Sequence, residues 1–409
     1  TSQTIPHGHS GSAAPPTDNH KTPRRAGRPV VRADAFRTDA ARIYDVTDTV
    51  SCEPGTLRLA AVGDLLLAPP LDGTPYPRNR RLVDDSIRQV FSECDLVLGN
   101  LECTLPGDGA CVPTEPRVVA TPDLVRAVAE AGFGVVTLAN NHAFDCCEPG
   151  FQNLKGLLGK LRLPHFGAGM NLEEAAAPLF LDVRGLRIAL LGAVDARSGP
   201  SHFATPSGFG VAPLNIERLE RQVGQLRSQV SHVIVSLHWG DERFSIPSPA
   251  QIEQAHRLVA SGASIVLGHH PHVLQGAERV DGKPIAYSLG NFFADEVHLS
   301  DGDAVRWDRT GRTGAILVAK LSKNGVAEVR HLPTYDSGRL VELDRSGFGG
   351  RRIERTARAI AQGVSPSRYR REHLWVNGVK PALRRLRWSE LARLRPRDFA
   401  KAVRVWREK

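Results

Sequence analysis

The sequence predicts a layered α/β fold. Apolar runs of strand length alternate with segments of helical spacing from residue 57 to residue 289. Polar residues gather where several of these runs end, and α/β folds bind their ligands at the carboxyl ends of their strands. The alternation therefore predicts both the scaffold and the place of a functional site.

The first half of the folded region is expected to form three strands and three helices. Thr121-Pro122-Asp123 is typical of a helix start, because threonine caps free backbone amides and proline suits the first turn. The glycines at 132 and 134 end that helix. The strands are expected at 57–62, 95–98 and 135–138, and the helices at 84–93, 121–131 and 150–161.

The second half is expected to continue the alternation and to close with a hairpin. Lys323-Asn324-Gly325 separates two β-rich runs, at 315–321 and 326–331, and is a hairpin signal. The remaining strands are expected at 180–183, 187–191, 233–237, 265–267 and 284–289, and the helices at 216–230 and 249–261.

Charge divides the 409 residues into three segments. Residues 1–50 hold 7 basic and 5 acidic residues, residues 351–409 hold 18 and 5, and the region between holds 28 and 34, so the net charge of +9 comes from the ends. We expect a disordered basic tail at 1–50, a folded domain at 51–348, and a basic, partly helical appendage at 349–409. The appendage either packs its tryptophans on the domain or docks on an anionic partner or membrane surface; no pattern in it points to specific nucleic-acid recognition.

Two further features bear on cellular location. No run approaches the 18 or so apolar residues that span a bilayer, and the first fifty residues contain no apolar signal core. The six cysteines form no Cys-x-x-Cys pairs, which argues against a zinc ribbon and favours a reducing compartment. We therefore expect a cytoplasmic protein; because the chain begins at Thr1, a processed secreted form is the alternative.

Five predicted strand ends carry residues that can bind a metal. Nitrogen and oxygen ligands together suit Zn²⁺, Mn²⁺ or Fe²⁺ better than Ca²⁺ or Mg²⁺, which prefer oxygen alone. A carboxylate, an asparagine and several histidines also suit a centre of two ions that activates water. The residues are Asp64, then Asn100 and Glu102, then Asn141, His142 and Asp145, then His238, and finally His270 and His272.

The segment His270-Pro271-His272 follows the apolar run at 265–267 and Gly268. Histidines at the mouth of a strand favour a metal site over a polar surface turn. Proline restricts the residue before it, so we expect His270 to be extended and both imidazole rings to face one ion.

In order along the chain, these motifs resemble the CapA family of capsule or poly-γ-glutamate synthesis proteins, within the calcineurin-like metallophosphoesterase superfamily. The resemblance spans residues 57–343 and implies a four-layer α/β/β/α sandwich over 51–348, with the metal centre at the carboxyl ends of the strands. The composition that follows predicts an arginine-rich helical C-terminal extension. The motifs are Gly-Asp at 63–64, Gly-Asn-Leu-Glu at 99–102, Ala-Asn-Asn-His-x-x-Asp at 139–145, His-Trp-Gly-x-Glu at 238–242, Gly-His-His-Pro-His at 268–272 and Tyr-Ser-Leu-Gly-Asn-Phe at 287–292.

The resemblance also implies roles for individual residues. His142 is similar to the histidine that stabilises the transition state, with Asp145 orienting its ring. One or two divalent ions, Mn, Fe or Zn, are expected. The implied metal ligands are Asp64, Glu102, Asn141, His238, His270 and His272, and the residues implied around them or facing substrate are Asn100, Glu242, His269 and Asn291.

The chain departs from the phosphoesterase pattern at three places. Leu66 stands where a ligand histidine is common, and Glu102 stands where a bridging aspartate is common and lacks the arginine that often follows to hold phosphate. Cys146 and Cys147 replace the expected Tyr-Gly; we interpret them as small packing residues, and metal ligands or redox-sensitive thiols are the alternative. These changes weaken the case for a phosphate ester as substrate.

Three functions are compatible with these residues. The first is a metal-dependent hydrolase in which activated water attacks a phosphoester or an amide, with a peptide, polyglutamate or phosphoester as substrate. The second is a metal-dependent peptide Cα epimerase, whose acid and base would come from Asp64, His142, His298 or His331. The third is a non-catalytic scaffold of a polymer synthesis or export complex.

Overall fold

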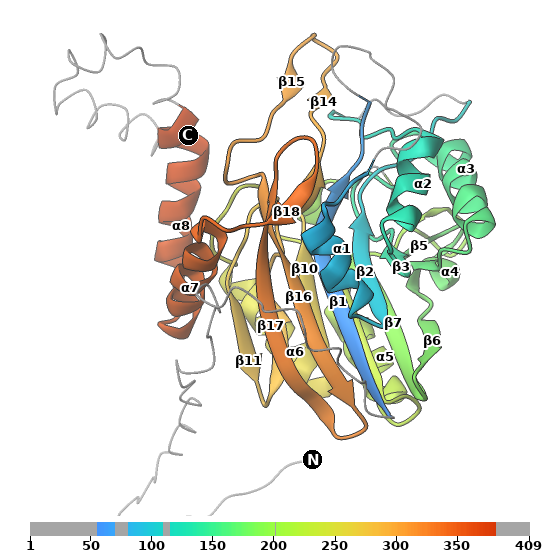
Figure 1. Cartoon of the computed structure of the whole chain (residues 1–409), viewed down its shortest axis with the longest axis vertical. Coiled ribbons are helices and arrows are strands. Elements are labelled where there is room, and N and C mark those ends of the chain that lie inside the picture. Colours follow the sequence, from blue (N-terminus) through green and yellow to red (C-terminus); the bar gives the residue numbers. More distant parts are fainter. Residues whose placement is uncertain (1–54, 70–80, 109–114, 201, 382–409) are drawn as a thin grey trace, which may run out of the picture. The chain divides into compact units, whose positions relative to one another are not determined.

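Two β-sheets pack face to face and helices cover both outer surfaces of the pair (Figure 1). The structure is a computed structural model and describes residues 55–69, 81–108, 115–200 and 202–381. The predicted tail at 1–50 and the end of the predicted appendage, 382–409, lie outside the described residues. The predicted boundaries after residues 50 and 348 stay predictions.

The first sheet is mixed and is built around β1. Its neighbours β2 and β13 run parallel to β1, whereas β16 runs antiparallel and pairs in turn with β17, which forms the predicted closing hairpin. The strands in order are β18 (Val341–Leu343), β17 (Gly325–Asp336), β16 (Thr313–Ser322), β1 (Thr56–Leu66), β2 (Leu96–Leu101), β3 (Val135–Thr137) and β4 (His165–Phe166), and β13 (Asn291–Ala294) pairs with β1 outside this path.

The second sheet has parallel strands at its centre, where β7, β9, β10 and β12 run in one direction. Its strands in order are β11 (Ala277–Val280), β12 (Lys283–Ala286), β10 (Ile265–His269), β9 (His232–His238), β7 (Leu186–Val194) and β6 (Leu179–Val183). Two small two-stranded sheets pair β5 (Ala168–Gly169) with β8 (Gly210–Val211), and β14 (Val297–His298) with β15 (Ala304–Val305).

The alternation of side chains along each strand separates the cores. In β1, Leu57, Leu59 and Ala61 point into the core between the sheets, whereas Ala60 and Val62 point into the core beneath the helices. Successive residues of a strand face opposite sides, so one strand buried on both faces supplies two cores. The four-layer α/β/β/α arrangement is therefore confirmed.

Helices cover the two sheets on opposite sides. The first sheet packs against α1 (Asp85–Ser92), α2 (Pro122–Glu130) and α3 (Cys147–Lys160), and the second against α5 (Ile216–Leu226) and α6 (Pro249–Ser261). Thr121 caps α2 as predicted, since its side chain accepts a hydrogen bond from the amide of Leu124. The remaining short helices are α4 (Leu172–Ala176) and the 3-10 turn η2 (Ala196–Ser198).

Several predicted boundaries were wrong, and the strands predicted at 57–62 and 326–331 extend to Leu66 and Asp336. The predicted strand at 284–289 is two separate segments, because β12 ends at Ala286 and the chain then crosses to the first sheet as β13. The crossing brings the carbonyl of Gly290 against Gly63, where a Cβ atom would lie 1.8 Å from that oxygen, so glycine is required there. The predicted helix at 150–161 begins at Cys147, and the one at 216–230 ends at Leu226.

The described part of the C-terminal segment begins with a helix that is built into the sandwich. In α7 (Phe348–Ala361), Ile353 packs in the core between the two sheets. Ile360 packs in the core between the second sheet and its helices α5 and α6. The chain continues as α8 (Pro366–Leu374) and the π-helical turn η3 (Trp375–Val379). Among the helices of the described residues, none combines the length and apolar composition that crossing a bilayer requires.

Candidate metal centre

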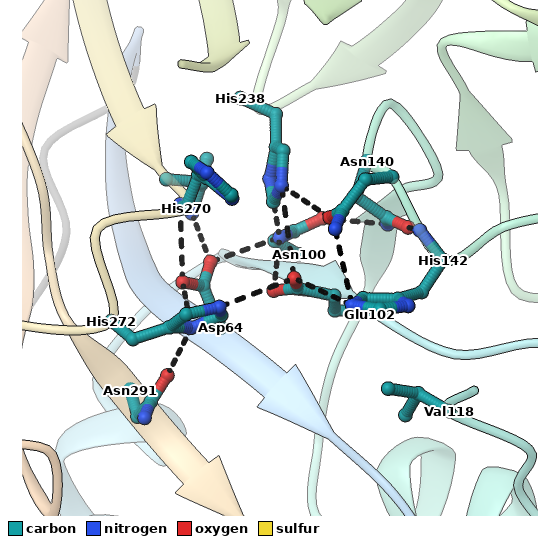
Figure 2. A network of polar contacts seen from close by, with 12 residues as sticks. Asp64, Asn100, Glu102, Val118, Asn140, His142, His238, His270, His272 and Asn291 are labelled. Atoms are coloured by element: carbon teal, nitrogen blue, oxygen red, sulfur yellow. Dashed lines mark hydrogen bonds and ion pairs between the residues drawn. The ribbon is translucent and has the colours of Figure 1, made fainter. Parts of the chain in front are cut away.

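Parallel strands of both sheets deliver polar side chains to one edge of the sandwich. In the first sheet, Asp64 at the end of β1 is in register with Asn100 of β2 and Asn291 of β13. In the second sheet, His238 at the end of β9 is in register with His269 of β10. All five residues are buried. Figure 2 shows the side chains of Asp64, Asn100, His238 and Asn291 close together, and His269 reaches Asp64 at 3.0 Å. The predicted gathering at the carboxyl ends of the strands is confirmed.

Glu102 lies at the middle of this cluster (Figure 2). Its Oε1 atom lies 3.7 Å from Nε2 of His238, 3.7 Å from Nε2 of His272 and 4.0 Å from Nε2 of His142. The same oxygen is buried and has no hydrogen-bond partner among the described residues. Its second oxygen, Oε2, accepts a hydrogen bond of 3.3 Å from the amide of Asn100.

Asp64 is held by donors from both sheets. Its Oδ1 atom accepts a hydrogen bond from Asn100 Nδ2 at 2.9 Å and lies 3.0 Å from Nδ1 of His269. Its Oδ2 atom accepts a hydrogen bond from the backbone amide of His270 at 3.2 Å and lies 3.3 Å from Nδ1 of His272. Burial acts to raise the pKa of this carboxyl, but His269 and His272 outweigh that effect and hold the pKa well below its ordinary value.

The pKa values of the other residues in the cluster are also shifted, because acidic and basic side chains lie close together in a buried place. Burial and the charge of Asp64 raise the pKa of Glu102 well above its ordinary value. Burial acts to lower the pKa of His272, yet the charges of Glu102 and Asp64 outweigh it and raise the pKa to about 10. Burial and the neighbouring His272 lower the pKa of His270 to about 4, and burial and His270 hold the pKa of His238 well below its ordinary value. Neutral imidazole, the form that binds metals, is thus favoured at His238 and His270.

His142 and Asp145 form a hydrogen-bonded pair at the side of the cluster. Nδ1 of His142 lies 2.7 Å from Oδ2 of Asp145, and that oxygen also accepts a hydrogen bond of 2.8 Å from the backbone amide of Val118. Both side chains are buried. The ring is therefore fixed so that its other nitrogen, Nε2, points toward Glu102 (Figure 2).

Asn141 connects this pair to His238. Its Oδ1 atom lies 2.7 Å from Nε2 of His238, and its Nδ2 atom lies 3.1 Å from Nε2 of His142. The predicted ligands His238 and Asn141 thus approach each other at the nitrogen of His238 that also faces Glu102.

The expected extended geometry of His270 was wrong. Its φ angle is +92° and that of His272 is +54°, both in the region that side chains with a Cβ rarely adopt. The turn is held by neighbouring contacts: the amide of His270 donates to Asp64, and the amide of Arg243 donates to the carbonyl of Pro271 at 2.7 Å. These contacts outweigh the preference that proline imposes on the residue before it. Such strain occurs where a site fixes the directions of its side chains.

The donor atoms fit a divalent metal. Two groups of ligand atoms, one from Glu102, His270 and His272 and one from Asp64, Glu102 and His238, each lie within 4.8 Å of one another and share Glu102. Ligands of a tetrahedral ion lie about 3.4 Å apart, since each bond is about 2.1 Å long. Besides Glu102 Oε1, Nδ1 of His270 is a buried atom without a hydrogen-bond partner among the described residues. Unpaired buried polar atoms that converge on one point are what a cation site requires.

The other predicted residues fall into two groups. Asn291 touches the cluster, because its Oδ1 atom accepts a hydrogen bond from Nδ1 of His272 at 2.9 Å. Glu242 is exposed; desolvation acts to raise its pKa, but His272 and His270 outweigh it and lower the pKa, which places this carboxylate near the cluster. The two further acid/base candidates lie elsewhere: His298 is exposed on β14, and His331 on β17 is separated from β1 by β16.

Sequence reasoning missed Asn140, which organises the cluster from behind. Its Nδ2 atom donates to Oδ1 of Asn100 at 3.0 Å and to the carbonyl of Leu101 at 2.9 Å, and its Oδ1 atom accepts from the amide of His142 at 3.1 Å. The residue is fully buried. The signal in the sequence was its position directly after the apolar run at 135–138. Two asparagines, Asn140 and Asn141, follow that run, and only Asn141 was predicted to belong to the site.

Curated relatives and solved structures resemble this chain over half of its length or more. The PGA biosynthesis protein CapA of Bacillus subtilis is 30% identical over 280 residues, which cover 68% of this chain and 71% of that protein. The capsule biosynthesis protein CapA of Bacillus anthracis is 34% identical over 218 residues, covering 52% and 50%. Among solved structures, the NAD nucleotidase of Haemophilus influenzae is 16% identical with a TM-score of 0.38, covering 76% of this chain and 56% of that chain.

A family profile matches more than half of the chain. The profile is described as Bacterial capsule synthesis protein PGA_cap, and it matches residues 58–296, which include every strand end that supplies the cluster. The resemblance to CapA proteins is confirmed, and the chain belongs to the PGA_cap family of bacterial capsule synthesis proteins.

Proposed function

We propose that this protein is a metal-dependent hydrolase that acts on an acidic peptide-type polymer in capsule or polyglutamate metabolism. The observation that carries the proposal is the position of Glu102, whose buried, unpaired Oε1 faces the Nε2 atoms of His238, His272 and His142. A buried carboxylate oxygen surrounded by imidazole nitrogens is costly without a cation between them.

The residues that would hold the ion or ions are Asp64, Glu102, Asn141, His238, His270 and His272. A divalent ion such as Mn²⁺, Fe²⁺ or Zn²⁺ polarises a substrate oxygen and lowers the pKa of water. Asn100 donates hydrogen bonds to the carboxylates of Asp64 and Glu102, and Asn140 holds Asn100 in place by donating to its Oδ1 atom. This support keeps the ligand directions constant while substrate binds.

His142 supplies the proton in the proposed reaction. When water adds to an amide carbonyl, the bond between carbon and nitrogen breaks only if the nitrogen receives a proton. The attacking water gives up one proton as it adds, and the leaving nitrogen takes one up. Asp145 holds Nδ1 of His142, so Nε2 is the atom that takes the proton from the water and delivers it to the nitrogen on the side of Glu102. The products are a carboxylate and an amine.

We favour an amide over a phosphoester as the bond that breaks. The chain lacks the arginine that commonly follows the second motif to hold phosphate, where Cys103 and Thr104 stand after Glu102. Both of these residues are fully buried, so neither reaches outward to a phosphate. The names of two relatives, which refer to PGA and to capsule biosynthesis, agree with a polymer of acidic residues.

The direct test is product analysis in H₂¹⁸O. Metal-loaded protein is incubated with γ-glutamyl oligomers and, separately, with aryl phosphates, and the products are analysed by mass spectrometry. We expect shorter oligomers with one ¹⁸O atom in each new carboxylate. Cleavage of phosphates alone would contradict the choice of bond, and exchange of Cα hydrogen in D₂O without cleavage would contradict hydrolysis.

A further inference from the structure

A cavity of about 190 Å³ opens beside His272, one of the predicted metal ligands. Its walls come from three places: the loop after β9 with Arg243, the loop before β16 with Trp307, and the C-terminal helices with Arg352 and Arg355. Trp307 joins the cavity to the cluster, because its ring lies 5.2 Å from that of His272. The cavity is smaller than the roughly 300–1,000 Å³ that holds a drug-sized ligand, and so it suits a single residue of a polymer.

The cavity is strongly basic. Five arginine or lysine side chains and two carboxylates line it. Both carboxylates already have partners, since Glu372 accepts from the backbone amide of Ser245 at 2.8 Å, and Asp308 accepts from the amides of Thr310 and Gly311 and pairs with Lys380 at 3.4 Å. Of the cationic side chains, Arg306 pairs with Glu296 at 3.6 Å and with Asp303 at 3.1 Å, outside the cavity lining. Arg243, Arg352 and Arg355 have no ion pair with a carboxylate of the described residues, so positive charge is in excess in the lining.

Arg352 carries the clearest sign of a missing anion. Its side chain is 8% exposed, and its Nε atom donates to the carbonyl of Leu274 at 3.0 Å. No carboxylate of the described residues lies within ion-pair distance of its guanidinium. Burial and the neighbouring Arg355 lower its pKa to about 10, against the opposing effect of Glu372. A buried charge without a counter-ion is costly, and an anion in the cavity would remove that cost.

Arg243 brings the same charge close to the metal cluster. Its guanidinium lies 5.9 Å from the ring of Trp307, and its backbone amide donates to Pro271, between the two histidines of the turn. A guanidinium at this place can bind an oxyanion through two parallel hydrogen bonds. If the bond to be cleaved lies at the metal cluster, the acidic group in the cavity would belong to the neighbouring residue of the substrate.

We propose that Arg243, Arg352 and Arg355 form a substrate subsite that binds the carboxylate of an acidic residue next to the bond that is cleaved. This subsite makes the protein selective for anionic peptides. The inference rests on the proposed function for the identity of the substrate, whereas the existence of the anion site rests on the cavity alone. The C-terminal helix α7 thereby contributes directly to substrate recognition.

The test compares single arginine variants of the full-length, metal-loaded protein. Arg355→Gln removes an exposed cavity residue that no core packing requires, and Arg352→Gln removes the buried one. The matched control is Arg358→Gln, on the same helix, whose side chain is 71% exposed and outside the cavity lining. Binding of a γ-glutamyl tripeptide, of its fully amidated analogue and of inorganic phosphate is measured by calorimetry, and metal content and thermal melting are recorded for each variant.

We expect the tripeptide to bind about tenfold to a hundredfold more weakly to Arg352→Gln and Arg355→Gln, since each loses a charge-assisted hydrogen bond. The control keeps wild-type affinity, all variants keep their metal, and the amidated analogue binds weakly to every form. Equal affinity in wild type and Arg355→Gln would overturn the subsite, even if the protein hydrolyses peptides. Preference for phosphate over the tripeptide would overturn the carboxylate assignment. Loss of binding in both variants of a protein that cleaves nothing would support the subsite and leave the proposed hydrolase reaction refuted.

Discussion

Nδ1 of His142 lies 2.7 Å from Oδ2 of Asp145, while Nε2 of the same ring lies 4.0 Å from Oε1 of Glu102. One imidazole therefore links a positioning carboxylate to the candidate metal ligands. The carboxylate of Asp145 is itself fixed by the amide of Val118.

Asp145→Asn is expected to lower kcat by about tenfold to a hundredfold with little change in KM, because the ring of His142 loses the partner that sets its orientation and tautomer. Steady-state kinetics on a glutamyl oligomer measure the effect, and metal content should stay unchanged. Asp123→Asn is the control, since Asp123 is an acid of α2 that pairs with Arg126 on the surface. Full kcat in Asp145→Asn would contradict the role of the pair.

Asn140→Ala is expected to lower the free energy of unfolding by about 2–4 kcal/mol, because it leaves buried groups of Asn100, Leu101 and His142 without partners. Urea denaturation of metal-free protein measures the change. Asn153→Ala removes an exposed asparagine with one bond to Pro106 and should alter stability by no more than about 0.5 kcal/mol. Equal stability of the two variants would refute the organising role of Asn140.

Stability at mildly acidic pH should depend on His331. Burial lowers its pKa to about 4, and its Nε2 atom is enclosed without a hydrogen-bond partner among the described residues. The unfolded chain, with a pKa near 6.5, binds the proton first, so the stabilisation present above about pH 6.5 is lost as pH falls toward 4.

His331→Leu should therefore reduce the loss of unfolding free energy between pH 7 and pH 4.5 by about 1–3 kcal/mol relative to wild type. Urea titrations at the two pH values measure it. His298→Leu, at an exposed histidine of β14, should show the wild-type loss. An unchanged pH dependence in His331→Leu would show that this ring is not held neutral by burial.

Ile353→Ala should lower the free energy of unfolding by about 2–5 kcal/mol, because Ile353 is 2% exposed in the core between the sheets. Val379→Ala, at a side chain that is 39% exposed in η3, should change it by less than about 0.5 kcal/mol. Chemical denaturation distinguishes the two outcomes. Similar small effects for both variants would mean that α7 is not part of the folded body.

The fold and most of the site were predictable because local patterns carry them. Strand β9 and helix α6 lie where the apolar run at 233–237 and the helical segment at 249–261 predicted them, and the ends of the parallel strands must meet at one edge. Glu102 and His272 could be chosen from residue type and position alone, and the structure brings them within 3.7 Å.

Features that depend on contacts between distant segments were not predictable. The crossing of β13 to β1 depends on the approach of Gly63 to Gly290, 227 residues later in the chain, which no local pattern encodes. The positive φ of His270 opposes the local effect of proline and arises from its bond to Asp64. The arginine-rich composition of residues 349–409 predicts exposed side chains, and so it gave no sign that Arg352 is buried beside the site.

The most direct test of the central claim is elemental analysis of purified protein by plasma mass spectrometry. The wild type should contain about one or two equivalents of Mn, Fe or Zn, and the double variant His270→Ala, His272→Ala should contain almost none. His256→Ala, which removes a histidine of α6 that pairs with Glu278, should keep the wild-type content. Wild-type protein that holds no metal even after reconstitution with each ion would contradict the metal centre and the hydrolase built on it.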